Sequence, residues 1–260
     1  MKAIILAAGE GKRLRPLTKN KPKCLVEVGG RTILDHQIAA FKRCGIEDIT
    51  VVKGYRADTI TRPDVKHIMN VDYDTTNMVM SLWCAREELK GDVIISYGDI
   101  IYSDHILRKL MNDRHDISVV VDLDWHEYWS QRFDDPLKDA EAFKMDKEGR
   151  IRVIGQVAQR ISDIDAGYIG LIKFIDRGNN IFIDSFLNAR LAAQQELPAW
   201  QSQRSIEKAY MTDMLQGLIW EGHDIFAVGI KGGWCEIDST RDLELASRLI
   251  SEGMLQPISF

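Results

Sequence analysis

A glycine-containing, strongly basic segment follows the first apolar run of the chain: residues 6–25 read LAAGEGKRLRPLTKNKPKCL. Gly9 and Gly11 lack a Cβ, so backbone amides beside them can approach the oxygens of a polyphosphate. Arg13 and Lys23 add positive charge for those oxygens. We therefore predict a loop that holds the triphosphate of a nucleotide. The competing interpretation is a basic turn that faces water, because runs of charge usually do.

The two best-known phosphate loops do not fit this segment. A dinucleotide fingerprint requires glycine at its first, third and sixth positions, and Leu14 stands where a glycine should follow Gly9 and Gly11. A P-loop requires Gly-Lys-Ser/Thr after four spacer residues, and no such triplet follows Gly9. We therefore expect a third kind of phosphate-binding loop.

Two aspartates are suitable ligands for the metal ion that phosphoryl chemistry usually needs. Asp99 follows the apolar run VIIS, and Asp238 lies between a strand-like segment and the start of a helix. Carboxylates commonly hold Mg²⁺ while phosphate oxygens and waters complete its octahedron. Asp238 also fits a helix N-cap, with Ser239 and Asp242 in a capping box. Asp99 also fits a turn after a glycine. Their joint occurrence with the glycine loop favours the metal.

Apolar runs typical of strands alternate with amphipathic stretches typical of helices along the first hundred residues. The strand-like runs are KAIILAA, DITVVKG, VKHIMN and DVIISYGD, and the helix-like stretches are RTILDHQIAAFKRCG and MVMSLWCAREEL. This alternation predicts an α/β fold: a Rossmann-like, mixed but mostly parallel sheet with helices on both faces. Ligands bind such sheets at the carboxyl ends of the strands. The loop at residues 9–12 and Asp99 should therefore share one crevice.

The pattern changes after residue 115. ISVVVDLD and AGYIGLIKF resemble strands, whereas residues 122–165 between them show weak periodicity and are rich in Trp, Arg and Asp. We expect residues 122–165 to be an insertion that covers the site as a lid and helps to bind the acceptor. Two helices, the strand DIFAVGI and a last helix from Thr240 should follow. No repeat or flexible linker divides the chain, so residues 1–260 are predicted to form a single domain.

The composition excludes several classes of protein. A chain of 260 residues that is 45% hydrophobic can bury a large core, and its net charge of −5 offers no general basic surface for nucleic acid. Its four cysteines contain no C-x-x-C pair, which argues against a zinc or redox site. The first apolar run is shorter than a membrane span and lacks a cleavage-site pattern. We therefore expect a cytoplasmic protein without nucleic-acid or membrane partners; the number of subunits is open, a homodimer being one option.

The basic loop resembles the signature of the sugar-phosphate nucleotidylyltransferase superfamily, in which a strand leads into Leu-Ala-Ala-Gly-x-Gly-x-Arg-Leu, Pro-Leu-Thr and Lys-Pro-Lys-x-Leu. The matching residues are Leu6 to Gly9, Gly11, Arg13, Leu14, Pro16, Leu17, Thr18 and Lys21 to Leu25. The segment Trp-x-Glu-Ile-Asp, followed by Asp242 and Ala246, matches as well. The resemblance implies a fold of the nucleotide-diphospho-sugar transferase type and Mg²⁺ held by Asp99 and Asp238. It implies catalytic roles for Lys23, Arg13, Asp99 and Asp238.

A second motif narrows the resemblance to one branch. Asn70, Tyr73, Thr76, Asn77, Ser81 and Leu82 look like the pattern of the choline-phosphate and phosphonate cytidylyltransferases, so CTP is the favoured donor. Asn77 and Ser81 can each donate and accept a hydrogen bond to a pyrimidine or ribose, although an N-cap and an exposed helical hydroxyl suit them equally. The nucleotide-binding residues are then expected to be Leu6, Ala7, Ala8, Gly9, Glu10, Gly11, Lys12, Arg13, Lys23, Asn77, Ser81, Tyr97 and Gly98.

The expected acceptor site lies in and beyond the insertion. Aromatic faces of Trp125 and Trp129 near acidic residues suit an ammonium group through cation–π attraction, as in phosphocholine or 2-aminoethylphosphonate. If Arg132 points into the pocket it would instead bind a phosphonate, and a neutral tail such as hydroxyethyl would be equally acceptable. Similarity to pocket positions of this branch adds further candidates, Asp165, Tyr168 and Asp213. The structural interpretation of the tryptophans is that they belong to the core.

The chemistry that these residues suggest needs no nucleophilic side chain. A phosphate or phosphonate oxygen of the acceptor attacks the α-phosphorus of CTP, and pyrophosphate leaves. The second pKa of a phosphate monoester is about 6, so the attacking group is already anionic at neutral pH. We therefore predict a Mg²⁺-dependent cytidylyltransferase. The alternatives are a sugar-1-phosphate nucleotidylyltransferase that uses UTP, dTTP or GTP, and a nucleotide-binding regulatory protein that has lost turnover.

Overall fold

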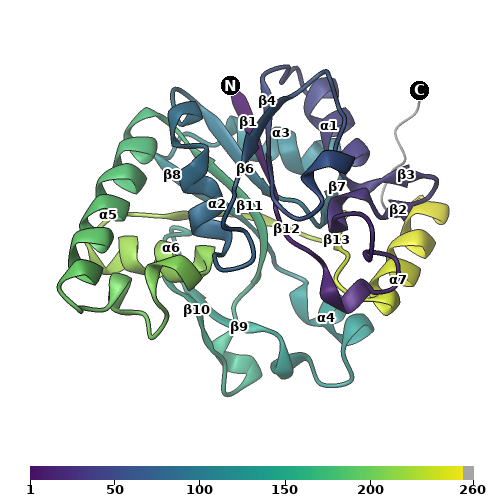
Figure 1. Cartoon of the computed structure of the whole chain (residues 1–260). Coiled ribbons are helices and arrows are strands. Elements are labelled where there is room, and N and C mark those ends of the chain that lie inside the picture. Colours follow the sequence, from purple (N-terminus) through teal and green to yellow (C-terminus); the bar gives the residue numbers. More distant parts are fainter. Residues whose placement is uncertain (254–260) are drawn as a thin grey trace.

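A seven-stranded sheet forms the centre of the protein in a computed structural model that describes residues 1–253 (Figure 1). The last seven residues of the single domain expected over 1–260 lie outside the described part. The strands follow the order β12-β8-β11-β6-β1-β4-β5. Their bounds are β1 Lys2–Ala7, β4 Ile49–Lys53, β5 Lys66–Met69, β6 Val93–Tyr97, β8 Ile117–Asp122, β11 Gly167–Phe174 and β12 Phe226–Ile230.

The sheet is mixed but mostly parallel, as the sequence predicts. β1 pairs in parallel with β4 and β6, β4 with β5, and β8 with β12, whereas β11 runs antiparallel to both of its neighbours. The apolar run VIIS forms most of β6, and residues 93–96 are all buried. A continuously apolar strand is expected where both faces of the sheet are covered.

Helices cover both faces of the sheet. Gln37 of α1 donates a hydrogen bond to Ser96 of β6, whereas Phe182 of α5 packs against Phe174, whose β6 partner is Val93. Positions 93 and 96 point to opposite faces because side chains alternate along a strand. α3 contacts α1, and α2 and α5 both contact α6. The helices are α1 Ile33–Arg43, α2 Met78–Cys84, α3 Asp104–Asn112, α4 Trp125–Arg132, α5 Asp176–Gln194, α6 Met211–Trp220 and α7 Thr240–Ser251.

The predicted helix boundaries have local causes. α1 begins after Thr32, whose side chain accepts a hydrogen bond from the amide of Asp35, and it is followed by Gly45 in the left-handed region at φ +84°. A glycine there terminates a helix at little steric cost. α5, α6, β12 and α7 occupy the stretches in which the sequence predicts two helices, a strand and a helix from Thr240.

Three small two-stranded sheets complete the fold: β2 (Glu27–Val28) with β3 (Arg31–Thr32), β7 (Ile100–Tyr102) with β13 (Trp234–Glu236), and β9 (Glu141–Met145) with β10 (Ile151–Val157). The chain leaves the main sheet at the end of β8 and returns with β11, and it builds α4, β9 and β10 in between. These elements occupy the segment 122–165. Its action as a lid stays a prediction. Within the described residues, none of the helices combines the length and the apolar character that crossing a membrane requires.

Candidate active site

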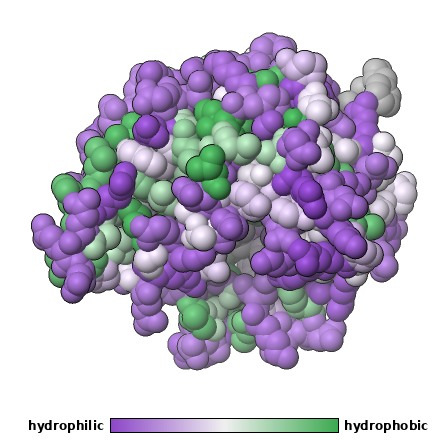
Figure 2. Space-filling view, viewed as in Figure 1, coloured by the Kyte–Doolittle hydropathy of each residue, from purple (hydrophilic) through white to green (hydrophobic). Residues whose placement is uncertain are grey.

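A cavity of about 720 Å³ opens where β1 and β6 end. Figure 2 shows this face of the molecule hollowed near its centre, with hydrophilic side chains around the hollow. All thirteen residues expected to bind the nucleotide line the cavity. Its other lining residues are Cys24, Tyr73, Asp74, Thr76, Met78, Asp99, Lys208, Tyr210, Glu236 and Asp238. The crevice predicted between the basic loop and Asp99 is therefore present.

The basic loop is shaped by two close approaches of its backbone. Gly11 has φ +68°, and a Cβ there would lie 2.9 Å from the Cβ of Lys23. A Cβ on Gly98 would lie 2.6 Å from the carbonyl oxygen of Leu6, so β6 and β1 can approach at this point only with glycine. Thr18 Oγ1 donates to the carbonyl of Gly11 at 2.8 Å and closes the loop. The loop therefore borders the cavity and is not a turn that faces only water.

Lys23 connects the loop to both predicted metal ligands. Its Nζ lies 2.7 Å from Asp99 Oδ2 and also contacts Asp238 Oδ1, and Arg13 forms a second ion pair with Asp238. Burial alone would lower the pKa of Lys23, but the charges of the two aspartates outweigh it and raise that pKa well above its usual value. Burial also opposes the charged form of Asp238, yet Lys23 and Arg13 hold the pKa of that carboxyl below its usual value. Both Lys23 and Asp238 are therefore charged at neutral pH.

The antiparallel pair β7–β13 brings the two aspartates together across more than 130 residues of chain. Asp99 directly precedes β7, Ile100 is opposite Glu236 in the ladder, and the amide of Ile237 donates to the carbonyl of Asp99 at 2.9 Å. The capping box of α7 is formed by Ser239 and Asp242. Asp238 is therefore not the N-cap, and its carboxylate points to Lys23 and Arg13.

Three carboxylates lie close enough to hold one divalent cation. One oxygen each of Asp99, Glu236 and Asp238 lies within 4.8 Å of the others. Asp99 Oδ1 is buried and accepts no hydrogen bond from a described residue, so it is an orphaned acceptor in a position to bind a cation. Hard oxygen ligands of this kind suit Mg²⁺. The residues therefore fit the magnesium ion expected from the sequence.

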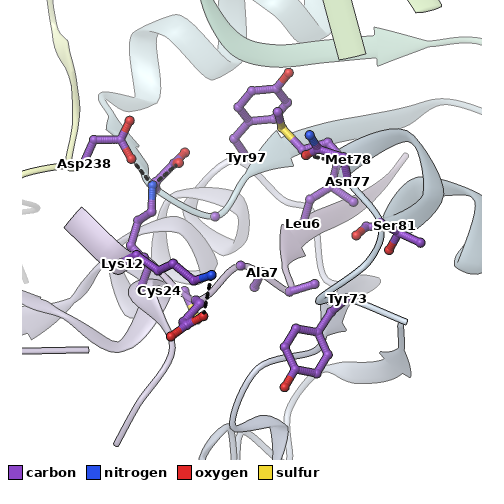
Figure 3. Close-up of a pocket in the computed structure, with 18 of the residues that line it drawn as sticks. Leu6, Ala7, Lys12, Cys24, Tyr73, Asn77, Met78, Ser81, Tyr97 and Asp238 are labelled. Carbon is purple, nitrogen blue, oxygen red and sulfur yellow. Dashed lines mark hydrogen bonds and ion pairs between the residues drawn. The ribbon is translucent and has the colours of Figure 1, made fainter. Parts of the chain in front are cut away.

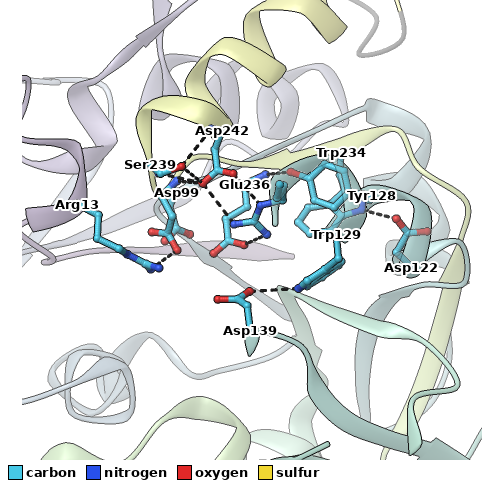
Figure 4. Close-up of polar contacts among 12 residues, drawn as sticks. Arg13, Asp99, Asp122, Tyr128, Trp129, Asp139, Trp234, Glu236, Ser239 and Asp242 are labelled. Atoms are coloured by element: carbon cyan, nitrogen blue, oxygen red, sulfur yellow. Dashed lines mark hydrogen bonds and ion pairs between the residues drawn. The ribbon is translucent and has the colours of Figure 1, made fainter. Parts of the chain in front are cut away.

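Glu236 is a member of this cluster that the sequence analysis did not assign. It stands two positions before Asp238 in the segment Trp-x-Glu-Ile-Asp, and alternation along a strand would have placed both side chains on one face. Burial raises the pKa of Glu236, the charges of Asp238 and Asp99 raise it further, and Arg132 opposes them. Figure 4 shows Glu236 beside Asp99, with Arg13 on the other side of Asp99.

The opposite end of the cavity carries polar groups on α2. Asn77 is the N-cap of α2, its Oδ1 accepting the amide of Met78, and it also lines the cavity, so the two interpretations of this residue are compatible. Ser81 is buried and its hydroxyl accepts a hydrogen bond from Asn70 at 3.0 Å. Figure 3 shows Asn77 and Ser81 across the cavity from Lys12 and Asp238. Lys208 and Tyr210 also line the cavity. The sequence analysis missed them because they lie in the stretch between α5 and α6, where it found no motif.

A second, smaller cavity of about 140 Å³ shares Glu236 with the first. The predicted acceptor residues Trp125, Trp129 and Tyr168 line it. Trp129 Nε1 donates to Asp139 at 3.1 Å (Figure 4), and the Tyr168 hydroxyl is buried without a hydrogen bond to a described residue. The remaining lining residues are Asp139, Ala140, Glu141, Ala142, Phe143, Ile154, Gly155, Ile164 and Gly167.

The other three predicted acceptor residues line neither cavity, and their role in binding the acceptor stays a prediction. The Arg132 guanidinium forms ion pairs with Glu236 and Asp242 and lines neither cavity. Asp165 accepts from Lys144 and from the backbone of β9. Asp213 caps the start of α6 and pairs with Arg204. In each case an oppositely charged group within the fold pairs with the side chain: Glu236 and Asp242 with Arg132, Lys144 with Asp165, and Arg204 with Asp213.

Residues 3–160 match the MobA-like NTP transferase domain family. The chain belongs to this family. It is 42% identical to the CTP:phosphoglutamine cytidylyltransferase of Campylobacter jejuni, over 94% of this chain and 98% of that protein. It is 33% identical to the choline-phosphate cytidylyltransferase of Streptococcus pneumoniae, over 58% of this chain and 67% of that protein.

The solved structures agree with this assignment. The CTP:phosphocholine cytidylyltransferase of Streptococcus pneumoniae superposes with a TM-score of 0.73 and 25% identity, over 96% of this chain and 98% of that one. The fold of the nucleotide-diphospho-sugar transferase type and the resemblance to the cytidylyltransferase branch are thus confirmed. The protein is a nucleotidyltransferase, and the prediction of an enzyme is confirmed.

Proposed function

We propose that the protein is a CTP-dependent cytidylyltransferase that transfers CMP to a small phosphorylated acceptor and releases pyrophosphate. The observation that carries the proposal is the convergence of Lys23, Asp99 and Asp238 beside the glycine loop of the larger cavity. The similarity over nearly the whole chain to an enzyme named for CTP and phosphoglutamine supports the choice of nucleotide.

The basic loop would hold the triphosphate. The backbone of residues 9–11 and the side chains of Lys12 and Arg13 border the cavity and offer donors to phosphate oxygens. Asp99, Asp238 and Glu236 would hold Mg²⁺, which would neutralise charge on the phosphates and on the departing pyrophosphate. The Lys23 ammonium would then leave the carboxylates and bind phosphate. Asn77 and Ser81 would contact the cytidine end.

No general base is required in this proposal. An acceptor phosphate oxygen forms a bond to the α-phosphorus of CTP while the bond to the bridging oxygen of pyrophosphate breaks. The acceptor phosphate is mostly dianionic at neutral pH because its second pKa is about 6. The cavity lining agrees with this chemistry, since it contains no histidine among the described residues. Positioning and charge neutralisation by Lys23, Arg13 and the carboxylates would supply the catalysis.

The smaller cavity would receive the tail of the acceptor. Its volume of about 140 Å³ matches roughly four or five water-sized groups, at about 30 Å³ each. The carboxyl groups of Asp139, Glu141 and Glu236 line it, and no Lys or Arg among the described residues does. The buried Tyr168 hydroxyl also borders it, beside Tyr97, and could bond a ligand. Such a lining favours a tail that carries a positive charge or N–H donors. Phosphoglutamine and phosphocholine are the first acceptors to test, and 2-aminoethylphosphonate and hydroxyethylphosphonate follow.

The experiment is a matrix of pyrophosphate release. CTP, UTP, dTTP, GTP and ATP are each combined with these four acceptors and with glucose 1-phosphate, with and without Mg²⁺. The proposal expects pyrophosphate release only where CTP, Mg²⁺ and one of these four small acceptors are together, and none with glucose 1-phosphate. If glucose 1-phosphate with UTP or dTTP is turned over faster than any of the four acceptors with CTP, the protein is a sugar-1-phosphate nucleotidylyltransferase and the proposal is wrong. Nucleotide binding without turnover of any acceptor would favour a regulatory role.

A further inference from the structure

Arg132 is the most enclosed cation in contact with the carboxylate cluster. Its side chain is 1% exposed, and Nη1 lies 2.6 Å from Glu236 Oε2. On its other side Nε donates to Asp242 Oδ1 at 2.9 Å. The rings of Tyr128, Trp129 and Phe133 lie 5.1–5.6 Å from the guanidinium carbon. The guanidinium is therefore held between a carboxylate of the cluster and a carboxylate of α7, and it is enclosed by three aromatic rings.

The two carboxylates that Arg132 contacts serve different purposes. Glu236 is one of the three candidate metal ligands, and Asp242 accepts the amides of Asp238 and Ser239 at 3.1 and 2.9 Å. Asp242 thereby fixes the backbone that carries Asp238. Arg132 of α4 thus contacts Glu236 directly and is linked to the backbone of Asp238 through Asp242.

We propose that Arg132 is a positioning residue that holds Glu236, and through Asp242 the backbone of Asp238, in the arrangement that binds the divalent cation. The inference rests on the metal role assigned under the proposed function. Tyr128 supports the same arrangement, because its hydroxyl accepts the amide of Glu236 at 2.8 Å. Arg132 and Tyr128 both belong to α4, and two other residues of this helix, Trp125 and Trp129, line the smaller cavity. The insertion would therefore help to build the metal site.

Two physical effects of Arg132 oppose one another, which makes the proposal testable. As a positive charge beside Glu236, it repels a cation, so a role of charge alone means that its removal strengthens metal binding. As a positioning group, it keeps a buried carboxylate aimed at the site, so its removal weakens metal binding. Loss of a group that orients a metal ligand typically costs 10- to 100-fold in affinity. The sign of the change therefore separates the two roles.

The experiment measures Mn²⁺ binding by electron paramagnetic resonance in the presence of CTP and without acceptor. Arg132→Gln is expected to weaken binding 10- to 100-fold. Arg132→Lys keeps the positive charge but loses the planar guanidinium that contacts Glu236 on one side and Asp242 on the other, so it should also weaken Mn²⁺ binding. Arg241→Gln is the matched control, because Arg241 joins α7 to the same insertion through Gln131 and Asp134 but is half exposed; its affinity should equal that of the wild type.

A double-mutant cycle distinguishes positioning from general loosening of the fold. Because Arg132 acts in part through Glu236, Arg132→Gln should weaken Mn²⁺ binding less in the Glu236→Gln background than in the wild type. Stronger Mn²⁺ binding in Arg132→Gln, an unchanged affinity, or a fully multiplicative double variant would overturn the proposal. If Asp99→Asn also leaves Mn²⁺ binding unchanged, the metal site itself is refuted; if only Asp99→Asn abolishes binding, the role of Arg132 alone is refuted. Arg132→Lys replaces Arg132→Gln in the cycle if the latter does not fold.

Discussion

Removing the charge of Lys23 should change metal binding and turnover in opposite directions. In the structure its ammonium contacts Asp99 Oδ2 at 2.7 Å and Asp238 Oδ1, two of the oxygens that would hold Mg²⁺. The ammonium and the metal therefore compete for the same ligands in the free enzyme. A hydrogen bond to a charged group contributes about 1.5–3 kcal/mol. Lys23→Met should thus bind Mn²⁺ roughly 10- to 100-fold more tightly than the wild type when CTP is absent.

The same substitution should lower stability in metal-free buffer. The side chains of Lys23, Asp99 and Asp238 are 15%, 19% and 11% exposed, so the variant leaves two nearly buried carboxylates without their shared cation. Breaking a buried pair costs about 3–5 kcal/mol, and we expect the lower end, about 3 kcal/mol. For a chain of this size that is a fall in Tm of about 6–12 °C. Mg²⁺ at 100 times its Kd should restore about 2.7 kcal/mol.

Turnover should fall at least a hundredfold, because Lys23 can no longer bind the phosphates in the transition state. Calorimetric titration with Mn²⁺, thermal unfolding with and without Mg²⁺, and pyrophosphate release test the three effects on one preparation. Lys19→Met is the control, since Lys19 is exposed in the same basic segment and lines neither cavity. Weaker Mn²⁺ binding than in the wild type, or turnover within threefold of it, would refute the reasoning.

Three further outcomes follow from single residues. Asp99→Asn should keep the fold, seen in an unchanged circular dichroism spectrum, and reduce pyrophosphate release at least a hundredfold; activity near that of the wild type would remove Asp99 from the metal site. Tyr168→Phe should raise the KM for the acceptor about fivefold, for a lost hydrogen bond of about 1 kcal/mol, and leave the KM for CTP unchanged; a change in the CTP value alone would contradict this. Burial lowers the pKa of His36, whose Nε2 lies 2.9 Å from the Val28 carbonyl. The unfolded chain therefore binds a proton on this histidine more readily than the folded protein does, so the free energy of unfolding should decline as pH falls below about 6.5. Urea titrations at several pH values should show a less steep decline in His36→Gln. The same decline with pH in both proteins would argue against this role of His36.

The fold was largely predictable because its signals are local. Alternating apolar and amphipathic runs predict the strands and helices, and the continuously apolar VIIS predicts a central strand, as β6 is. The pairing of β7 with β13 was not predictable in this way. Each strand has only three residues, and their partners lie more than 130 positions apart. That pairing gathers the carboxylates, so the sequence indicated two of the three, Asp99 and Asp238, but not Glu236 or their contacts.

The predicted acceptor residues also show that the sequence does not reveal which side chains pair in the fold. Trp125, Trp129 and Tyr168 line the smaller cavity, but whether they bind an acceptor stays a prediction. Arg132 lies in the same segment and has a suitable charge, yet the nearest carboxylates in the folded chain belong to β13 and α7. A charged side chain pairs with the opposite charge that packs against it, and tertiary structure determines which one that is. Sequence spacing alone does not reveal it.

The central claim is that the basic loop and three acidic side chains surround one metal-bound CTP. The most direct measurement is a crystal structure of the enzyme with CTP and Mn²⁺, with the metal located by its anomalous scattering. We predict Mn²⁺ bonded to oxygens of Asp99, Asp238 and Glu236, with the triphosphate against the backbone of residues 9–11 and Lys23 turned from the carboxylates to a phosphate. A metal bound elsewhere, or a triphosphate that does not touch the basic loop, would contradict the account.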